Sequence, residues 1–230
     1  METLVNNLNE LINDIEAVCT RCGRNPSEVE IVPASKFQPL DSLLALKNDG
    51  RIKVFGENRV QEFLTKYTPK LEWDIIGQLQ TNKVKYIIDK VRLIQSVDRE
   101  SLAIEIEKQA SKINKVQKVL VEINSGAEEN KGGILTSEAE SFCKSLKKFP
   151  HIKVIGLMAV APLGVERDTL KELFLSVKNV YDKIAKYNSD FEVLSMGMSG
   201  DYALAIECGS TMIRPGRILF GERIYPTKIN

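Results

Sequence analysis

The sequence predicts an α/β protein that folds as a single (β/α)8 barrel of the TIM type, with an extra helix at its N-terminus. Strand-like apolar runs alternate along the chain with segments of helical periodicity, which favours parallel strands joined by helical crossovers. Eight such units in 230 residues favour a closed barrel. An open doubly wound sheet is the alternative, because one or two misassigned strands would remove the count of eight. No linker rich in proline, glycine or serine divides the chain, so we expect residues 1–230 to form one domain.

Each strand candidate is a short run rich in β-branched and other apolar residues. In chain order these runs are Val29–Ser35, Ile52–Phe55, Trp73–Gly77, Arg92–Val97, Gln117–Asn124, Ile152–Val160, Glu192–Met196 and Thr211–Phe220. The segments between them have apolar residues spaced three and four positions apart, which predicts helices. These are Leu40–Lys47, Arg59–Tyr67, Asn82–Asp89, Arg99–Ile113, Ser137–Lys147, Arg167–Lys186 and Tyr202–Cys208. An amphipathic helix at about Leu4–Val18 comes first, and Asp98 and Thr136 are the expected N-caps of the fourth and fifth helices that follow the strands.

The composition is that of an ordinary globular protein, with 43% hydrophobic residues, 27% charged residues and a net charge of +1. Such a balanced charge gives no electrostatic reason to expect a nucleic-acid partner or an anionic membrane. No apolar run is long enough to span a membrane, and the N-terminus lacks the pattern of a signal peptide. We therefore expect a cytoplasmic protein, and we expect it to be a monomer.

The four cysteines and the single histidine do not form the pattern of a metal site or a hydrolase. Cys19 and Cys22 make a CxxC pair, but it lies near the end of a helical pattern and no second pair follows. Because a structural zinc site needs four close ligands, we predict no metal and interpret the pair as helix-end residues. His151 precedes an apolar strand, which disfavours a Ser/His or Cys/His hydrolase.

Residues suited to a functional site follow nearly every predicted strand, and a lysine follows the first. They are Lys36, Glu57-Asn58, Gln78, Ser96, Asn124, Met158, Ser195 to Ser199, and Arg214. In a barrel of this kind the chemistry takes place at the C-terminal ends of the strands. A lysine at the end of a buried strand is suited to act as an amine nucleophile that forms Schiff bases. The alternative is a structural lysine whose amine reaches the solvent.

The segments after the seventh and eighth strands predict an anion site. Residues 195–201 contain small side chains that let the backbone approach a ligand, and they open a helix whose N–H groups attract anions. Arg214 and Gly216 lie at the eighth strand, and barrel enzymes often hold a phosphate on these two loops. A plain N-cap at Ser199 or Asp201 is the alternative. Together with Lys36, such a site favours an aldehyde cofactor with a phosphate, and pyridoxal 5′-phosphate (PLP) has both groups.

Several stretches, spread in order over nearly the whole chain, resemble the PLP homeostasis proteins, whose barrel is similar to the N-terminal domain of alanine racemase. The stretches are Ala34-Ser35-Lys36, Phe55-Gly56-Glu57-Asn58 with Val60-Gln61-Glu62, Ile76 through Lys83, Gly156-Leu157-Met158-Ala159, Leu194–Ser199, and Arg214 through Gly221. The resemblance implies PLP as the cofactor and a Schiff base on Lys36. It also implies phosphate contacts from Ser199 and from the backbone near Gly216 and Arg217, and we include Gly200, beside Ser199, in the predicted site.

The chain departs from the family's pattern at a few positions. Gln78 stands where the family usually has histidine, and Arg59 stands where it has tyrosine. Residues 215–217 replace a stretch that commonly includes a small hydroxyl residue, so one side-chain contact to phosphate is lost and the charge of Arg217 becomes its substitute. Pro33 removes a hydrogen-bond donor from the first strand, which is typical of a bulge. None of these departures affects Lys36.

Arg214 and Asn58 complete the predicted site. By analogy with alanine racemase, Arg214 would face the pyridine nitrogen, where a cation disfavours protonation of the ring; pairing with the phosphate is the alternative. Asn58 is placed to form a hydrogen bond near the ring. We interpret Met158 and Met196 as core residues.

The resemblance implies a protein that carries and buffers PLP. Racemisation needs two bases, and alanine racemase takes its second from an appended domain and a dimer partner, whereas this sequence ends at Asn230 soon after the last strand. We therefore predict a PLP carrier without enzymatic turnover, with PLP-dependent apoenzymes as the recipients. One alternative is a small PLP-dependent amino-acid racemase or lyase. The other is a barrel enzyme that binds a sugar phosphate and uses Lys36 as an aldolase-type amine.

Overall fold

The structure, a computed structural model, describes residues 2–128, 132–162 and 164–222, and in them the predicted barrel is confirmed. All strands are parallel, and eight of them follow the barrel order β1-β9-β8-β7-β5-β4-β3-β2. Their bounds are β1 Glu30–Ile31, β2 Val54–Glu57, β3 Glu72–Ile75, β4 Leu93–Val97, β5 Gln117–Asn124, β7 Ile152–Ala159, β8 Val193–Ser195 and β9 Met212–Ile213. A ninth short strand, β6 (Ile134–Leu135), pairs only with β5 and was not predicted.

The barrel closes between its first and second strands through a single parallel bridge from Ala34 to Gly56. Two backbone hydrogen bonds form this closure. Ser35 N–H donates to Gly56 O at 2.8 Å, and Gly56 N–H donates to Pro33 O at 2.9 Å. This contact excludes the open doubly wound sheet, because the two edge strands of an open sheet would not meet.

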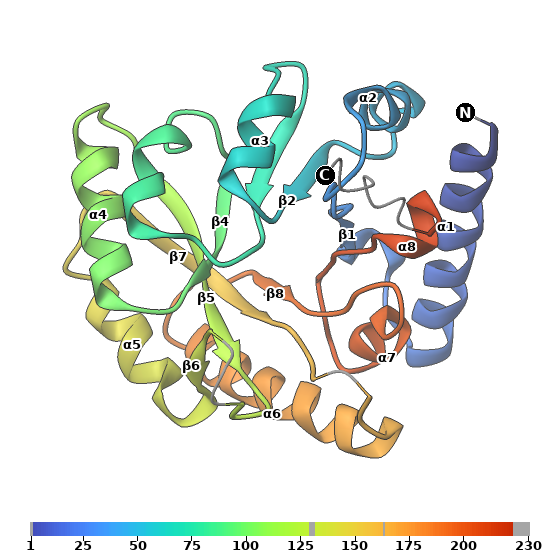
Figure 1. The fold of residues 1–230 in the computed structure, drawn as a ribbon. Helices are drawn as coiled ribbons and strands as arrows, with labels where there is room; N and C mark the ends of the chain where they lie inside the picture. The colour runs from blue at the N-terminus through green and yellow to red at the C-terminus, as the bar shows by residue number, and fades with distance from the viewer. Residues whose placement is uncertain (1, 129–131, 163, 223–230) are drawn as a thin grey trace.

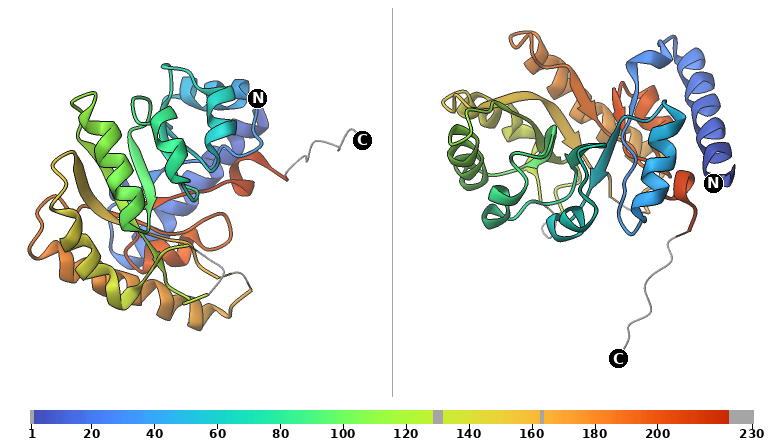
Figure 2. Two further views of the ribbon diagram at one scale, coloured as in Figure 1. Left: turned by 60° about the vertical axis from the view of Figure 1, so that its left-hand side comes forward. Right: turned by 90° about the horizontal axis from the view of Figure 1, so that it is seen from above.

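Helices surround the barrel on its outside (Figure 1). Their bounds are α1 Glu2–Cys22, α2 Leu40–Asp49, α3 Val60–Lys66, α4 Glu100–Ser111, α5 Ala139–Leu146, α6 Arg167–Ala185, α7 Tyr202–Glu207 and α8 Arg217–Phe220. The extra N-terminal helix α1 lies beside α7 and α8, on the opposite side of the barrel from α4 and α5 (Figure 2). Its buried face, which includes Leu11, Ile15 and Val18, packs against Tyr202 and Ile206 of α7.

Alternate residues of the strands fill the barrel interior, as the period of two in a β-strand requires. The apolar interior residues are Val32, Val54, Leu93, Leu120, Ile155, Met158 and Met212. Residues of the opposite parity, such as Phe55 and Ile94, pack against the surrounding helices. Met158 and Met196 are both fully buried, which confirms their interpretation as core residues.

The first and last barrel strands are shorter than predicted. Strand β1 ends at Ile31, although Val32 and Ala34 still donate to the β9 side, and Pro33 has no N–H to donate to β2. The predicted strand Thr211–Phe220 is wrong beyond Ile213, since Pro215 again lacks a donor and α8 follows it. The segment after Pro215 forms a helical turn, because the N–H groups of Leu219 and Phe220 donate to Gly216 O at 3.0 and 2.9 Å.

The predicted caps of the fourth and fifth helices are also wrong. Asp98 does not cap α4; its carboxylate instead accepts hydrogen bonds from Arg99 (2.6 Å) and from the N–H of Gly133 (3.4 Å). Thr136 opens a short 3-10 turn, and α5 begins only at Ala139 without a side-chain cap. The third predicted helix, Asn82–Asp89, is a 3-10 helix over Thr81–Tyr86.

The CxxC pair lies at the end of α1, which confirms its interpretation as a helix-end feature. Cys19 is buried, Cys22 is exposed and is the last residue of the helix, and the Cys22 thiol lies 3.6 Å from Cys19 O. Burial raises the pKa of the Cys19 thiol, so the thiol form is favoured. Among the residues that the structure describes, no cluster of His, Cys, Asp and Glu is arranged to hold a metal ion, and no helix is both long and apolar enough to cross a membrane.

Candidate functional site

Lys36 lies just beyond the C-terminal end of β1, at the mouth of the barrel. It lies in the turn at residues 35–38, which closes when Gln38 N–H donates to Ser35 O at 2.9 Å. The Lys36 side chain is half-buried, and its Nζ lies 5.0 Å from the ring centroid of Phe37. Because it follows the first strand, Lys36 lies at the end of the barrel where the C-terminal ends of the parallel strands gather.

Ser199, in the loop after β8, and Gly216, between β9 and α8, lie together beside the segment that contains Lys36. Ala34 N–H donates to Pro215 O at 2.8 Å, which joins the Lys36 segment directly to the segment that contains Gly216. The Ser199 hydroxyl accepts hydrogen bonds from the N–H groups of Gly216 (2.9 Å) and Ile218 (3.2 Å). Two backbone N–H groups thus converge on one oxygen, which is the arrangement that also suits an oxygen of an anion.

Gly200 and Arg217 were predicted in the same site but lie further out. Both residues are exposed, and a Cβ added at Gly200 would meet no atom within 4 Å. Asp201 accepts a hydrogen bond from Met198 N–H at 2.5 Å, so it caps the loop that opens α7. The structure therefore groups Ser199 and Gly216 beside the Lys36 segment and places Gly200 and Arg217 on the rim.

Arg214 is fixed in the wall of the barrel below this loop. The residue is 3% exposed, and its guanidinium donates to Ser195 Oγ and to Ala159 O, the latter at 2.9 Å. Burial lowers the pKa of Arg214 to about 10, and Glu122 and Asp201 partly offset that change. No carboxylate of the described residues forms an ion pair with it, so its charge is available to an anion or to a ring nitrogen.

A chain of hydrogen bonds runs from Arg214 through the barrel interior to the opposite end. Ser195 Oγ donates to Gln95 Oε1 at 2.8 Å, and Gln95 Nε2 donates to Asp74 Oδ2 at 2.8 Å. Arg92 then binds Asp74 at 2.8 Å. Each member has a defined partner, which fixes Ser195 and through it the guanidinium of Arg214.

Comparisons with known proteins agree with this geometry. Residues 7–224 match the family described as alanine racemase, N-terminal domain. The chain is 43% identical over 223 residues to the pyridoxal phosphate homeostasis protein of Aquifex aeolicus, and the match covers 95% of this chain and 97% of that protein. This chain belongs to the pyridoxal phosphate homeostasis protein family.

Solved structures show the same barrel. A protein from Bifidobacterium adolescentis described as unknown has a TM-score of 0.91 and 26% identity, with 95% of each chain covered. PipY of Synechococcus elongatus, solved with PLP bound, has a TM-score of 0.77 and 28% identity, with 90% of this chain and all of PipY covered. The recognition drawn from the sequence motifs is therefore confirmed.

A cavity of about 310 Å³ opens beside Asn58 at the mouth of this homeostasis-family barrel. Its other lining residues are Ile76, Gly77, Gln78, Glu122, Ile123, Asn124, Gly132 and Val160. Gly77 is required for the shape of this wall, because a Cβ there would lie 2.4 Å from Asn58 O. The cavity combines apolar walls with a few polar groups, as ligand sites commonly do.

Glu122 is a charged residue of this cavity that the sequence interpretation missed. It has the same parity in β5 as Leu120, so its side chain points into the barrel. Its Oε2 is buried and has no hydrogen-bond partner among the described residues. Burial raises the pKa of Glu122 to about 7, with Asp98 adding to the shift and Arg214 and Arg99 opposing it. The sequence does contain a signal for it, namely a single acidic residue within the apolar run 119–123.

We expect Glu122→Gln to stabilise the protein at neutral pH relative to the wild type. The ordinary pKa of a glutamate is 4.5, whereas that of folded Glu122 is about 7. As pH rises from 4.5 to 7, the unfolded chain loses this proton first, so wild-type stability falls and then levels off. The difference in unfolding free energy between variant and wild type should grow by up to about 3 kcal/mol over that range. Urea denaturation at a series of pH values measures this difference. If the unfolding free energies of the two proteins changed with pH in parallel, the raised pKa of Glu122 would be contradicted.

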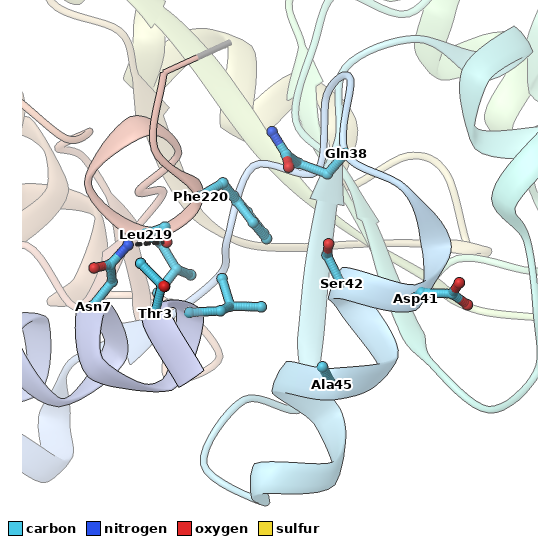
Figure 3. A pocket seen from close by; sticks show the side chains of 9 residues that line it. Thr3, Asn7, Gln38, Asp41, Ser42, Ala45, Leu219 and Phe220 are labelled. Atoms are coloured by element: carbon cyan, nitrogen blue, oxygen red, sulfur yellow. Dashed lines mark hydrogen bonds between the residues drawn. The ribbon is translucent and has the colours of Figure 1, made fainter. Parts of the chain in front are cut away.

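A second cavity, of about 270 Å³, lies outside the barrel between α1, α2 and α8 (Figure 3). Gln38 and Ser42 line one side of it, and Thr3, Asn7 and Phe220 line the other. Asn7 Nδ2 donates to Leu219 O at 2.9 Å, which ties α1 to α8 at this point. None of the predicted site residues lines this cavity, so the barrel mouth remains the candidate site.

Proposed function

We propose that this chain binds PLP reversibly through the Lys36 amine and holds the cofactor for delivery to other proteins. The observation that carries this proposal is the position of Lys36 beside the Ser199–Gly216 pair. Lys36 offers an amine, and the Ser199–Gly216 pair offers hydrogen-bonding groups suited to a phosphate. The family supports the same conclusion, since its curated members are named for PLP homeostasis and the PipY structure contains PLP.

The residues present fit this cofactor. The N–H groups of Gly216 and Ile218 already point at one oxygen, that of Ser199, and they suit a phosphate oxygen equally well. When bound, PLP supplies an aldehyde that reacts with an amine. Lys36 would hold that end, while Ser199, Gly200 and the backbone at Gly216 and Arg217 would hold the phosphate. Asn58 would form a hydrogen bond near the ring, and Arg214 would serve either the ring nitrogen or the phosphate.

The proposed role is storage and transfer without turnover, by a monomer in the cytoplasm. The only histidine, His151, binds Glu107 at 2.7 Å on the outside of the barrel and is not placed to act as a base at the mouth. The recipients that suit this role are PLP-dependent apoenzymes.

A titration and a transfer assay test this function. Adding PLP to the purified protein is expected to produce an absorbance band distinct from that of free PLP. Mixing the loaded protein with an apoenzyme that depends on PLP is expected to restore the activity of that enzyme. The absence of any band would refute PLP binding. Racemisation or cleavage of amino acids at an enzyme-like rate would refute the carrier role and favour the racemase or lyase alternative.

A further inference from the structure

A buried cluster of charged residues lies directly behind the segment that contains Lys36. It consists of Glu57, at the end of β2, and Glu62 and Lys66, both on α3; we call it the Lys66 cluster. Lys66 Nζ lies 2.6 Å from Glu57 Oε2 and 2.9 Å from Glu62 Oε1. The side chain of Lys66 is 9% exposed and that of Glu57 is fully buried. Charged groups of this kind are rarely buried unless they are paired.

The Lys66 cluster binds the peptide groups on both sides of Lys36. Lys66 Nζ donates to Ser35 O at 2.8 Å, and the Ser35 hydroxyl donates to Glu57 Oε2 at 2.7 Å. On the other side of Lys36, Phe37 N–H donates to Glu62 Oε1 at 2.5 Å. The carbonyl before Lys36 and the N–H after it are therefore each held by a charged side chain. Hydrogen bonds to charged groups are the stronger ones, so this segment is held firmly.

The backbone at Phe37 shows why such support is needed. Its φ is +64°, a left-handed conformation that a bulky L-residue rarely adopts. The bond from Phe37 N–H to Glu62 supports this conformation, and Lys66 in turn holds Glu62 through the ion pair. If the peptide at Phe37 relaxed to an ordinary conformation, the chain direction after Lys36 would change, and the direction of the Lys36 side chain would change with it.

We propose that Lys66 and Glu62 are positioning residues that direct the Lys36 amine into the barrel mouth and so set the rate at which it captures an aldehyde. The choice of PLP as the aldehyde rests on the proposed function. In the capture step the neutral amine adds to the carbonyl carbon, a C=N bond replaces C=O, and the oxygen leaves as water. No oxidant or reductant takes part, and the cluster contributes only the placement of the amine.

The test compares Lys66→Met with Lys66→Arg and with a control at Lys115. Lys115 is the control because its amine, like that of Lys66, holds the backbone: it donates to the carbonyls of Ile88 (2.6 Å) and Val91 (2.7 Å), between the 3-10 helix Thr81–Tyr86 and the start of β4. The rate constant of capture is measured by stopped-flow absorbance with PLP and with pyridoxal, which has no phosphate. We expect Lys66→Met to slow both reactions by about ten- to a hundred-fold. Lys66→Arg should restore part of the rate, and Lys115→Met should leave it unchanged despite lowering the melting temperature.

A second pair of variants keeps the test decisive if Lys66→Met does not fold. Glu62→Met removes the acceptor of Phe37 N–H and is expected to slow capture. Adding Phe37→Gly should recover part of the loss, because glycine adopts a φ of +64° without strain. The inference would be overturned if Lys66→Met or Glu62→Met captured the aldehyde as fast as the wild type. It would also be overturned if Lys115→Met slowed capture as much as Lys66→Met does. A wild-type protein that captures no PLP would instead refute the proposed function.

Discussion

Lys36→Ala is expected to fold as the wild type does and to lose covalent PLP binding completely. The Lys36 side chain is half-buried at the mouth, and its Nζ lies 5.0 Å from the centroid of the Phe37 ring. Its truncation should therefore change the unfolding free energy by about 0.5 kcal/mol or less. Only the noncovalent contacts to the phosphate would remain, so we expect the affinity for PLP to fall about 100-fold or more, equivalent to roughly 2.7 kcal/mol. Absorbance titration measures the affinity, and mass spectrometry after borohydride reduction shows whether PLP is attached.

Lys83→Ala is the matched control for that variant. Lys83 is also a half-buried lysine beside an aromatic ring, with its Nζ 5.8 Å from the ring centroid of Tyr86. It lies on the 3-10 helix Thr81–Tyr86, away from the β1 end, so PLP binding should be unchanged. If the Lys36→Ala protein still gave a reduced PLP adduct, the attachment point would be a different amine.

Gly156→Ala is expected to have the largest effect on folding. Gly156 in β7 pairs with Val193 in β8, and a Cβ at Gly156 would lie 1.7 Å from Val193 O. Because the obstacle is backbone, no side-chain rotation can relieve it, and β8 must move away from β7. We expect a loss of about 3 kcal/mol or more in unfolding free energy. Thermal melting should show it as a fall of roughly 6–12 °C. Since β8 also contains Ser195, which holds Arg214, PLP affinity should fall as well.

Gly200→Ala is the control for stability. Gly200 has no positive φ, and a Cβ there would meet no atom within 4 Å. Its melting temperature should therefore stay within about 1 °C of the wild type, in line with other surface substitutions. Equal melting temperatures for Gly156→Ala and the wild type would show that β7 and β8 can separate without cost, contrary to the pairing in this structure.

The sequence was sufficient to predict the barrel and the end of the barrel at which the site lies. Alternating strands and helices imply parallel pairing, and parallel pairing brings all C-terminal strand ends to one mouth. For that reason Lys36, Ser199 and Gly216 could be grouped although the sequence separates them widely. The sequence motifs identified the family, and the family implied PLP as the cofactor.

The sequence did not reveal features that depend on three-dimensional packing. Lys66 lies four residues after Glu62 in the predicted helix Arg59–Tyr67, and only the fold places both of them behind Lys36. Glu122 lies in the predicted strand Gln117–Asn124, and its raised pKa follows from burial that the sequence does not report. The turn into α8 after Pro215 was missed because the apolar residues 218–220 suit a strand as well as a helix.

The closure of the barrel has a consequence for how a bound cofactor could leave. β5 and β7 are paired along their whole length, whereas the backbones of the first two barrel strands pair only at Ala34 and Gly56, two residues before Lys36. Side chains strengthen this seam, because Glu57, Glu62 and Lys66 on its β2 and α3 side bind the residues on both sides of Lys36. Parting it would break those charge-assisted bonds together with the backbone bridge, so we expect the backbone around Lys36 to stay in place. A cofactor held by Lys36 would then be released by water, which returns the oxygen to the aldehyde and frees the amine, without the barrel coming apart.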